Sequence, residues 1–297
     1  MAASEGEAGN DAVARRLDEA AALLEAQEAD RFRVRAYRRA AAQIRGLDRP
    51  VAEILRGEGR PGLTAVPGIG DSIARAVSEM VETGRWALLE RLRGGSAPES
   101  LFATLPGIGP GRAAEIHDAL HVDTLEALEI AAHDGRLESV DGIGPKTAAA
   151  IRDVLATRLR RRRSARPDPA GDEPGVALLL EIDRLYRARA AEGALPKIAP
   201  RRFNPEGRAW LPILHAEREG WSVTAVFSNT ALAHRLGRTD DWVVVYFERD
   251  GAPEGQRTVV TERRGPLAGR RVVRGREAEC RALAEGGPEP RARRKRA

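Results

Sequence analysis

The stretches VPGIGDSIARAV (residues 66–77), LPGIGPGRAAEI (105–116) and VDGIGPKTAAAI (140–151) repeat one pattern three times. Each has an apolar residue, Pro or Asp, Gly-Ile-Gly, a small or polar pair, and then an alanine-rich run. A short segment of helical character, VAEILRG, ESLFATL or TLEALEIAAHDGRL, precedes each stretch. Glycine permits backbone angles that other residues avoid. The repeat therefore predicts three hairpins, each made of two helices joined by a glycine turn.

Such a hairpin has a chemical use. The backbone amides of the turn, the free N–H groups of the second helix and the helix dipole together favour a phosphate oxygen. One Gly-x-Gly is equally a plain tight turn, but three copies with matched apolar flanks argue against coincidence. Phosphate contacts read no base edge, so the predicted binding is independent of sequence. The predicted hairpin contacts are Gly68, Ile69, Gly70, Gly107, Ile108, Gly109, Arg112, Gly142, Ile143, Gly144 and Lys146.

An arginine-rich segment, RFRVRAYRRAAAQIRGL, precedes the first hairpin at residues 31–47. It has helical periodicity, and no acidic residue occurs between Asp30 and Asp48. A charge run is often only a solvated helix face, but a single sign over this span favours an anionic partner. We therefore add four arginines to the predicted DNA contacts: Arg33, Arg35, Arg38 and Arg39.

Composition limits the class of protein. The 297 residues carry a formal net charge of +5 and a sequence pI of about 9.9. The one cysteine, Cys280, excludes a disulfide scaffold and a cysteine-based zinc site. No apolar run reaches transmembrane length, and the N-terminus does not resemble a signal peptide. We expect a cytoplasmic, nucleoid-associated protein with no membrane partner.

The chain divides where its composition changes. Pro, Gly and Asp after the arginine cluster at residues 158–163 predict the main boundary, and strand-like runs such as WSVTAVFS and DWVVVYFER follow it. We expect two all-α hairpin domains and then a mixed α+β domain with an antiparallel sheet. The expected divisions are disorder at 1–10, hairpin domains at 11–93 and 101–163, a linker at 164–174, the α+β domain at 175–285, and a basic disordered tail at 286–297.

The N-terminal half resembles family X DNA polymerases. Residues 11–93, with FRVRAYRRAAAQI, LTAVPGIGDSIARAVSEMVETGR and LLERLR, look like the lyase domain of that family. Residues 101–160, with the second and third hairpins, look like the next domain of bacterial members. The polymerase palm requires Gly-Ser followed by Asp-x-Asp for two metal ions. The chain has no Asp-x-Asp, and Gly95-Ser96 lies between the hairpin domains, so polymerase activity is not expected.

The lyase chemistry of the family also lacks its nucleophile in this chain. The resemblance implies a Schiff-base lysine on the helix after the first hairpin, and the matching position is Ala76. The neighbouring Arg75 cannot substitute, because a guanidinium stays protonated. The resemblance therefore implies a module that binds DNA ends or gaps. It further implies K⁺ or Na⁺ at the turns around Gly68 and Gly107, with no other cofactor required.

The C-terminal domain resembles an uncharacterised bacterial domain, through segments such as APRRFNPEGRAWLPILH and FSNTALAHRLGRTDDWVVVYF. His215, His234, Glu248 and Glu262 are candidates for a metal site or an acid–base pair. The alternative is that the glutamates lie at the ends of strands on the surface and the histidines pair with buried backbone groups. We favour this alternative because no spacing matches a metal template. His117 and His121 are expected on a helix surface.

These observations predict a sequence-independent DNA-binding protein that acts at gaps, ends or junctions in repair or recombination. The alternative is a nuclease or other phosphodiester-acting enzyme with its site in the C-terminal domain. A second alternative is a scaffold that brings repair proteins to duplex, gapped or junction DNA.

Overall fold

The computed structural model describes residues 9–94, 102–164 and 173–286, apart from residues 104, 106, 121, 123, 124, 134 and 251. The predicted disorder at residues 1–8, most of the predicted linker and the basic tail after residue 286 lie outside the described residues. Among the described residues, no helix combines the length and the apolar character that crossing a membrane requires.

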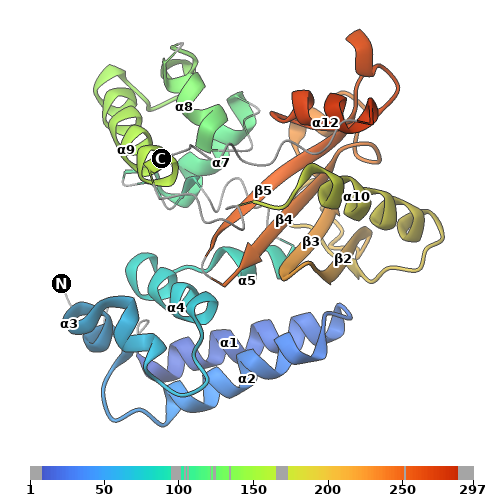
Figure 1. Ribbon diagram of the computed structural model, residues 1–297. Helices are drawn as coiled ribbons and strands as arrows, with labels where there is room; N and C mark the ends of the chain where they lie inside the picture. The colour runs from blue at the N-terminus through green and yellow to red at the C-terminus, as the bar shows by residue number, and fades with distance from the viewer. Residues whose placement is uncertain are drawn as a thin grey trace, which may run out of the picture.

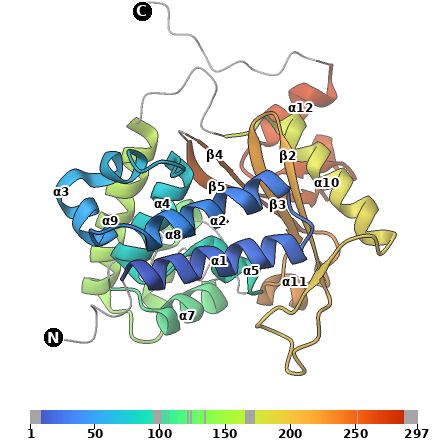
Figure 2. The same ribbon diagram turned by 90° about the horizontal axis from the view of Figure 1, so that it is seen from below.

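Five helices form the first unit. They are α1 (Asn10–Ala26), α2 (Arg31–Arg45), α3 (Val51–Thr64), α4 (Asp71–Thr83) and α5 (Ala87–Leu92). The helices α1 and α2 lie side by side, and α5 lies between this pair and the sheet (Figures 1 and 2). Alanines and aliphatic side chains from all five helices form one buried cluster, as the apolar periodicity predicts.

The expected disorder at residue 10 is wrong, because Asn10 is the first residue of α1. Its side-chain amide donates hydrogen bonds to the carbonyls of Leu47 (3.2 Å) and Arg49 (3.0 Å). Its side-chain oxygen accepts a hydrogen bond from the Val51 amide at 2.8 Å. The Asn10 side chain thereby holds the start of α1 against the segment that leads into α3.

The second unit contains the other two hairpins. It consists of α7 (Pro110–Leu120), α8 (Leu125–His133), the short 3₁₀ helix η1 (Arg136–Ser139) and α9 (Pro145–Ser164). These elements share a separate buried cluster that includes Phe102, Ile116 and Leu128. Figure 1 places them to one side of the sheet, apart from the α1–α2 pair.

The C-terminal region is a six-stranded sheet with helices. In the sheet, strands follow the order β1-β2-β3-β4-β5-β6 with antiparallel neighbours throughout. This confirms the predicted fold class, in which helical hairpin units precede a mixed region with an antiparallel sheet. The elements are α10 (Val176–Ala191), β1 (Lys197–Ile198), β2 (Leu211–Arg218), β3 (Trp221–Phe227), α11 (Ala231–Arg235), β4 (Val243–Arg249), β5 (Ala252–Thr261), η2 (Gly265–Leu267), β6 (Arg271–Val273) and α12 (Glu277–Ala284).

The two faces of this sheet differ in character. One face carries apolar side chains such as Val223, Val245 and Phe247, which pack in a buried cluster with α10 and α12. Successive side chains of a strand point to opposite faces. The intervening positions, among them His215, Thr224 and Glu248, therefore form a more polar face, and the contacts described below place it against the first helical unit.

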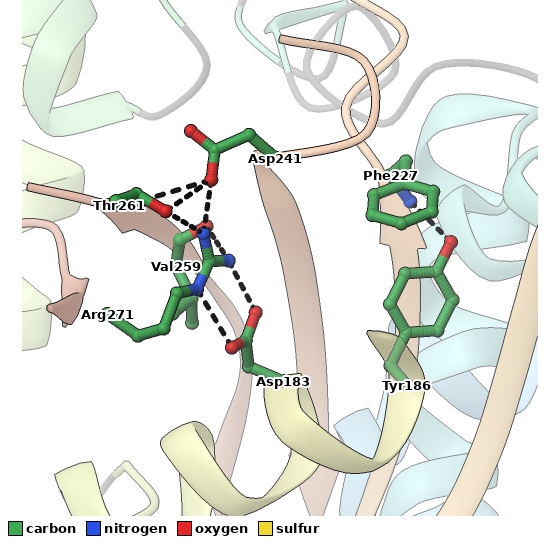
Figure 3. A network of polar contacts seen from close by, with 7 residues as sticks. All are labelled: Asp183, Tyr186, Phe227, Asp241, Val259, Thr261 and Arg271. Carbon is green, nitrogen blue, oxygen red and sulfur yellow. Dashed lines mark hydrogen bonds and ion pairs between the residues drawn. The ribbon is translucent and has the colours of Figure 1, made fainter. Parts of the chain in front are cut away.

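Two polar contacts fix α10 to the sheet (Figure 3). The Arg271 guanidinium binds the Asp183 carboxylate through two hydrogen bonds of 3.0 and 2.5 Å, and it also reaches Asp241. The Tyr186 hydroxyl donates to the Pro212 carbonyl (2.9 Å) and accepts from the Phe227 amide (2.8 Å). These contacts set the position of α10 on the apolar face.

Candidate nucleic-acid interface

The three Gly-Ile-Gly turns share one backbone geometry. The first glycine of each turn has a positive φ, of +84°, +80° and +74° in chain order. The isoleucine is 3% exposed in every turn, whereas both glycines are exposed. The turns are Gly68-Ile69-Gly70, Gly107-Ile108-Gly109 and Gly142-Ile143-Gly144. Each isoleucine fixes its turn to the core and leaves the glycine backbone accessible to a ligand.

Hydrogen bonding within the turns is also the same. The isoleucine amide donates to the carbonyl three residues earlier, at 3.1 Å in the first turn and 3.0 Å in the other two. The second glycine precedes the helix that follows, which is α4, α7 or α9. The first N–H groups of a helix have no partner within the helix. Each turn therefore leads to amides that have no partner within the helix and to the positive end of the helix dipole, which together favour an anion.

The second and third turns lie close to each other. Arg112 donates to the Gly107 carbonyl at 3.0 Å. A Cβ placed on Gly142, in the third turn, would be 3.8 Å from the Arg112 Nη2 atom. Lys146 is exposed on the first turn of α9. The two turns therefore present neighbouring anion sites, with Arg112 between them and Lys146 beside the third.

The first turn differs in its charged neighbours. The helix after it begins with Asp71, which pairs with Arg75 at 3.0 Å. The nearest predicted basic contact is Arg39 of α2, whose Cδ atom would be 2.9 Å from a Cβ on Gly68. Arg35 and Arg38 are also exposed on α2, and Arg38 pairs with Glu25 at 2.6 Å. These positions leave three of the four arginines predicted on α2 at the surface.

Arg33 is not on that surface, which corrects its predicted place among the DNA contacts. Its side chain is only 11% exposed and forms an ion pair with Glu248 of β4. The Arg33 guanidinium also lies 6.0 Å from the centre of the Tyr37 ring. Glu248 therefore neutralises the charge of Arg33 at the contact between the first helical unit and the sheet.

His215 belongs to the same buried interface. Its Nε2 atom lies 3.0 Å from the Gln27 side-chain oxygen, and its Nδ1 atom lies 3.0 Å from the Thr224 hydroxyl. Burial, together with the positive charges of Arg33 and Arg91, lowers the pKa of His215 to about 3. The imidazole is therefore neutral at physiological pH and serves as a hydrogen-bonding group between domains.

Further contacts join α5 to the C-terminal region. Arg91 forms an ion pair with Glu254 and stacks on the Tyr246 ring, 4.4 Å from its centre. The Gly94 carbonyl accepts a hydrogen bond from the Arg201 amide at 2.9 Å. Gly94 has a φ of +81°, and a Cβ there would be 2.1 Å from the Ala199 carbonyl oxygen. Position 94 therefore requires glycine, and no local sequence pattern indicates this constraint.

The remaining C-terminal candidates lie in other contacts. The His234 Nε2 atom is 2.6 Å from the Asn229 side-chain oxygen, and its ring packs against Phe203. Glu262 accepts hydrogen bonds from the Arg263 amide (2.7 Å) and from Arg274 (2.8 Å). In the part of the chain that the structure describes, no three His, Cys, Asp or Glu side chains converge as a metal site. The arrangement thus does not unite the four residues proposed for a nuclease.

Two positions on the helical units bear on the resemblance stated above. Ala76 is buried in the core of the first unit, so a lysine there would have to leave the core to act as a nucleophile. His117 was expected on a helix surface, but it is 1% exposed and lies 3.0 Å from an Arg202 nitrogen. The surface prediction for His117 is wrong because the C-terminal region covers it, and His121 lies outside the described residues.

Comparison with known proteins agrees with these hairpins. Residues 8–86 match the model of a helix-hairpin-helix domain, and residues 99–157 match that of a SAM-like helix-hairpin-helix tandem. The DNA polymerase/3'-5' exonuclease PolX of Bacillus subtilis (strain 168) is 28% identical over 145 residues, which are 48% of this chain. The match spans 24% of PolX, about a quarter of its length. The N-terminal half of the chain therefore contains two helix-hairpin-helix domains and is distantly similar to part of PolX.

Proposed function

We propose that this protein binds the DNA backbone without sequence preference and acts at gaps, ends or junctions in repair or recombination. The observation that carries the proposal is the shared geometry of three turns, each with exposed glycines directly before the start of a helix. The similarity to PolX, named as a DNA polymerase and exonuclease, supports a role in DNA repair. Binding to repair proteins and a cytoplasmic, nucleoid-associated location are part of this proposal.

A monovalent cation is a further part of the proposal. Backbone carbonyl oxygens are suitable ligands for K⁺. The turns consist of exposed glycine backbone, which fits such an ion. At the second turn the Gly107 carbonyl already accepts a hydrogen bond from Arg112, so a cation there would compete with the guanidinium. We therefore favour the turn around Gly68, where α4 begins with the carboxylate of Asp71.

The test is fluorescence anisotropy with single-stranded, duplex, gapped and junction DNA over a series of salt concentrations. Affinity should fall steeply with salt and depend little on sequence. Replacing Gly144 with Asp places a carboxylate where the phosphate is proposed to bind. Asp is also a preferred residue before a helix, so the fold should be retained. Loss of charge-assisted hydrogen bonds worth about 1.5–3 kcal/mol should weaken binding about tenfold or more.

Gly57→Asp is the matched control. Gly57 is exposed on α3, has no described atom within 4 Å of a Cβ placed on it, and would receive the same charge. Equal weakening by Gly57→Asp and Gly144→Asp would show that only net charge matters and would reject the hairpin site. Lys146→Gln should reduce the salt slope by about one unit on every sequence tested, as loss of one phosphate contact predicts.

The same experiment separates the alternatives. DNA recovered after incubation with Mg²⁺ is examined on a denaturing gel. Cleavage that is lost on changing His215 or Glu248 would favour the phosphodiester-acting enzyme over the binding protein. Repair proteins that co-purify after the DNA has been digested would favour the scaffold. Absence of binding to any DNA would reject the proposal.

A further inference from the structure

An acidic side chain from the C-terminal region lies at the first hairpin. One carboxylate oxygen of Asp250 accepts a hydrogen bond from the Ser72 amide at 3.2 Å. The other would be 3.9 Å from a Cβ on Gly70. Ser72 is the second residue of α4, and Gly70 precedes that helix. The Asp250 carboxylate therefore occupies the start of α4, where the proposed function places a phosphate of the DNA backbone.

The position of Asp250 follows from the sheet. Arg249 of β4 pairs with Ala252 of β5, so Asp250-Gly251 connects two antiparallel strands. Asp-Gly is favoured in two-residue connections of this kind. The ends of β4 and β5 that this connection joins lie near α4 (Figures 1 and 2), and Asp250 contacts α4 at Ser72. The Asp250 carboxylate therefore lies on a short connection between two strands. The sheet itself positions it at the hairpin.

Neighbouring contacts hold this tip in place. Arg75 of α4 donates to the Arg249 carbonyl at 3.0 Å. The Arg249 guanidinium lies 4.3 Å from the centre of a Trp221 ring. The buried pairs of Arg33 with Glu248 and of Arg91 with Glu254 flank the same connection. Several independent contacts therefore support the placement of Asp250, which does not rest on its hydrogen bond alone.

The other two hairpins have no such cover among the described residues. A Cβ placed on Gly109 or Gly144, the positions equivalent to Gly70, would meet no described atom within 4 Å. The residue that begins the following helix also differs, since Asp71 corresponds to Pro110 and Pro145. The first hairpin is therefore both covered by a carboxylate and more acidic than its two counterparts.

We infer that Asp250 acts as an internal substitute for a DNA phosphate and closes the first hairpin in the DNA-free protein. This inference rests on the proposed function. DNA binds the second and third hairpins directly. It binds the first hairpin only when a phosphate displaces the Asp250 carboxylate. The sheet thereby regulates how many of the hairpins take part in binding.

The test compares the full-length protein with Asp250→Asn, in which Asn-Gly keeps the favoured connection between β4 and β5. An anion at a helix start is worth about 0.3–1 kcal/mol, so removing the competing charge should tighten DNA binding about two- to fivefold. One additional phosphate contact should steepen the slope of log affinity against log salt by about 0.9. Affinity is measured by anisotropy with gapped and duplex DNA.

Two double variants with the same net charge as the native protein test whether the negative charge must lie at the start of α4. Gly70→Asp/Asp250→Asn returns a carboxylate to the start of α4 and should abolish the gain. Gly57→Asp/Asp250→Asn places the charge on α3 and should retain it. Equal affinities for the two double variants, or no gain for Asp250→Asn while native protein binds DNA, would overturn this inference alone. Failure of every protein to bind DNA would reject the proposed function itself.

Discussion

Replacing Arg271 with Met is expected to destabilise the C-terminal region strongly. Asp183 is 1% exposed, and the Arg271 guanidinium supplies two of its hydrogen bonds. The same side chain reaches the Asp241 carboxylate at 2.5 Å and the Val259 carbonyl at 3.0 Å (Figure 3). Removing one partner of a buried ion pair costs about 3–5 kcal/mol, because the other charge is left unpaired.

Urea denaturation, monitored by tryptophan fluorescence, measures the loss in the free energy of unfolding. With a slope of about 1–3 kcal/mol per M, the midpoint should fall by at least about 1 M. Arg274→Met is the matched control. Arg274 is 48% exposed and pairs with Glu262, so its loss should cost less than about 1 kcal/mol.

A second variant separates lost charge pairing from lost packing. Arg271→Met/Asp183→Leu removes the buried carboxylate as well, and apolar replacements of buried ion pairs are often neutral. The double variant should therefore regain most of the stability. A loss below about 1 kcal/mol for Arg271→Met, or a double variant as unstable as the single one, would refute the reasoning.

Two further predictions concern the contact between the first helical unit and the sheet. Burial and the charges of Arg33 and Arg91 lower the pKa of His215 to about 3. Below about pH 6.5 the histidine is therefore protonated in the unfolded chain but stays neutral in the folded protein. Stability should be unaffected above pH 6.5 and fall by up to about 1.4 kcal/mol per unit between pH 6.5 and 3. This loss should be smaller in His215→Gln. Urea titrations of both proteins at pH 7.5, 5.5 and 4.5 measure it, and an equal loss of unfolding free energy in the two proteins would contradict the prediction. Gly94→Ala should lower the melting temperature more than Gly84→Ala, because both glycines have positive φ but only at Gly94 would a Cβ meet backbone. Equal melting temperatures would count against the close approach.

The hairpins could be predicted from the sequence because their determinants are local. A glycine with positive φ, a buried isoleucine and an alanine-rich helix follow one another within a few residues, and the pattern occurs three times. The strands β3 and β4 could also be predicted, because the runs WSVTAVFS and DWVVVYFER are rich in β-branched and aromatic residues. The short strand β1 was missed, and so was β2, whose start contains Pro212 and whose later residues His215 and Glu217 weaken its apolar pattern.

The contacts between distant segments could not be predicted in this way. Arg33 and Glu248 are 215 positions apart, and an arginine on a basic helix gives no sign that its partner lies in a strand. His215 and Gln27 are likewise separated by 188 positions. A single sequence records periodicity within an element, but it does not record which faces of two elements meet. Consequently the basic pattern of α2 predicts Arg33 on the DNA surface, and no local pattern indicates the contact of Asp250 with α4.

The buried pairs of Arg33 with Glu248 and of Arg91 with Glu254 also affect how the protein can be dissected. A shortened chain that ended after the first helical unit would keep both arginines and lose both glutamates. It would also lose Asp250 from the start of α4. Such a fragment would present cations that the intact protein neutralises, and any polyanion would attract it more strongly. Affinities measured on the isolated fragment would therefore overstate those of the whole molecule.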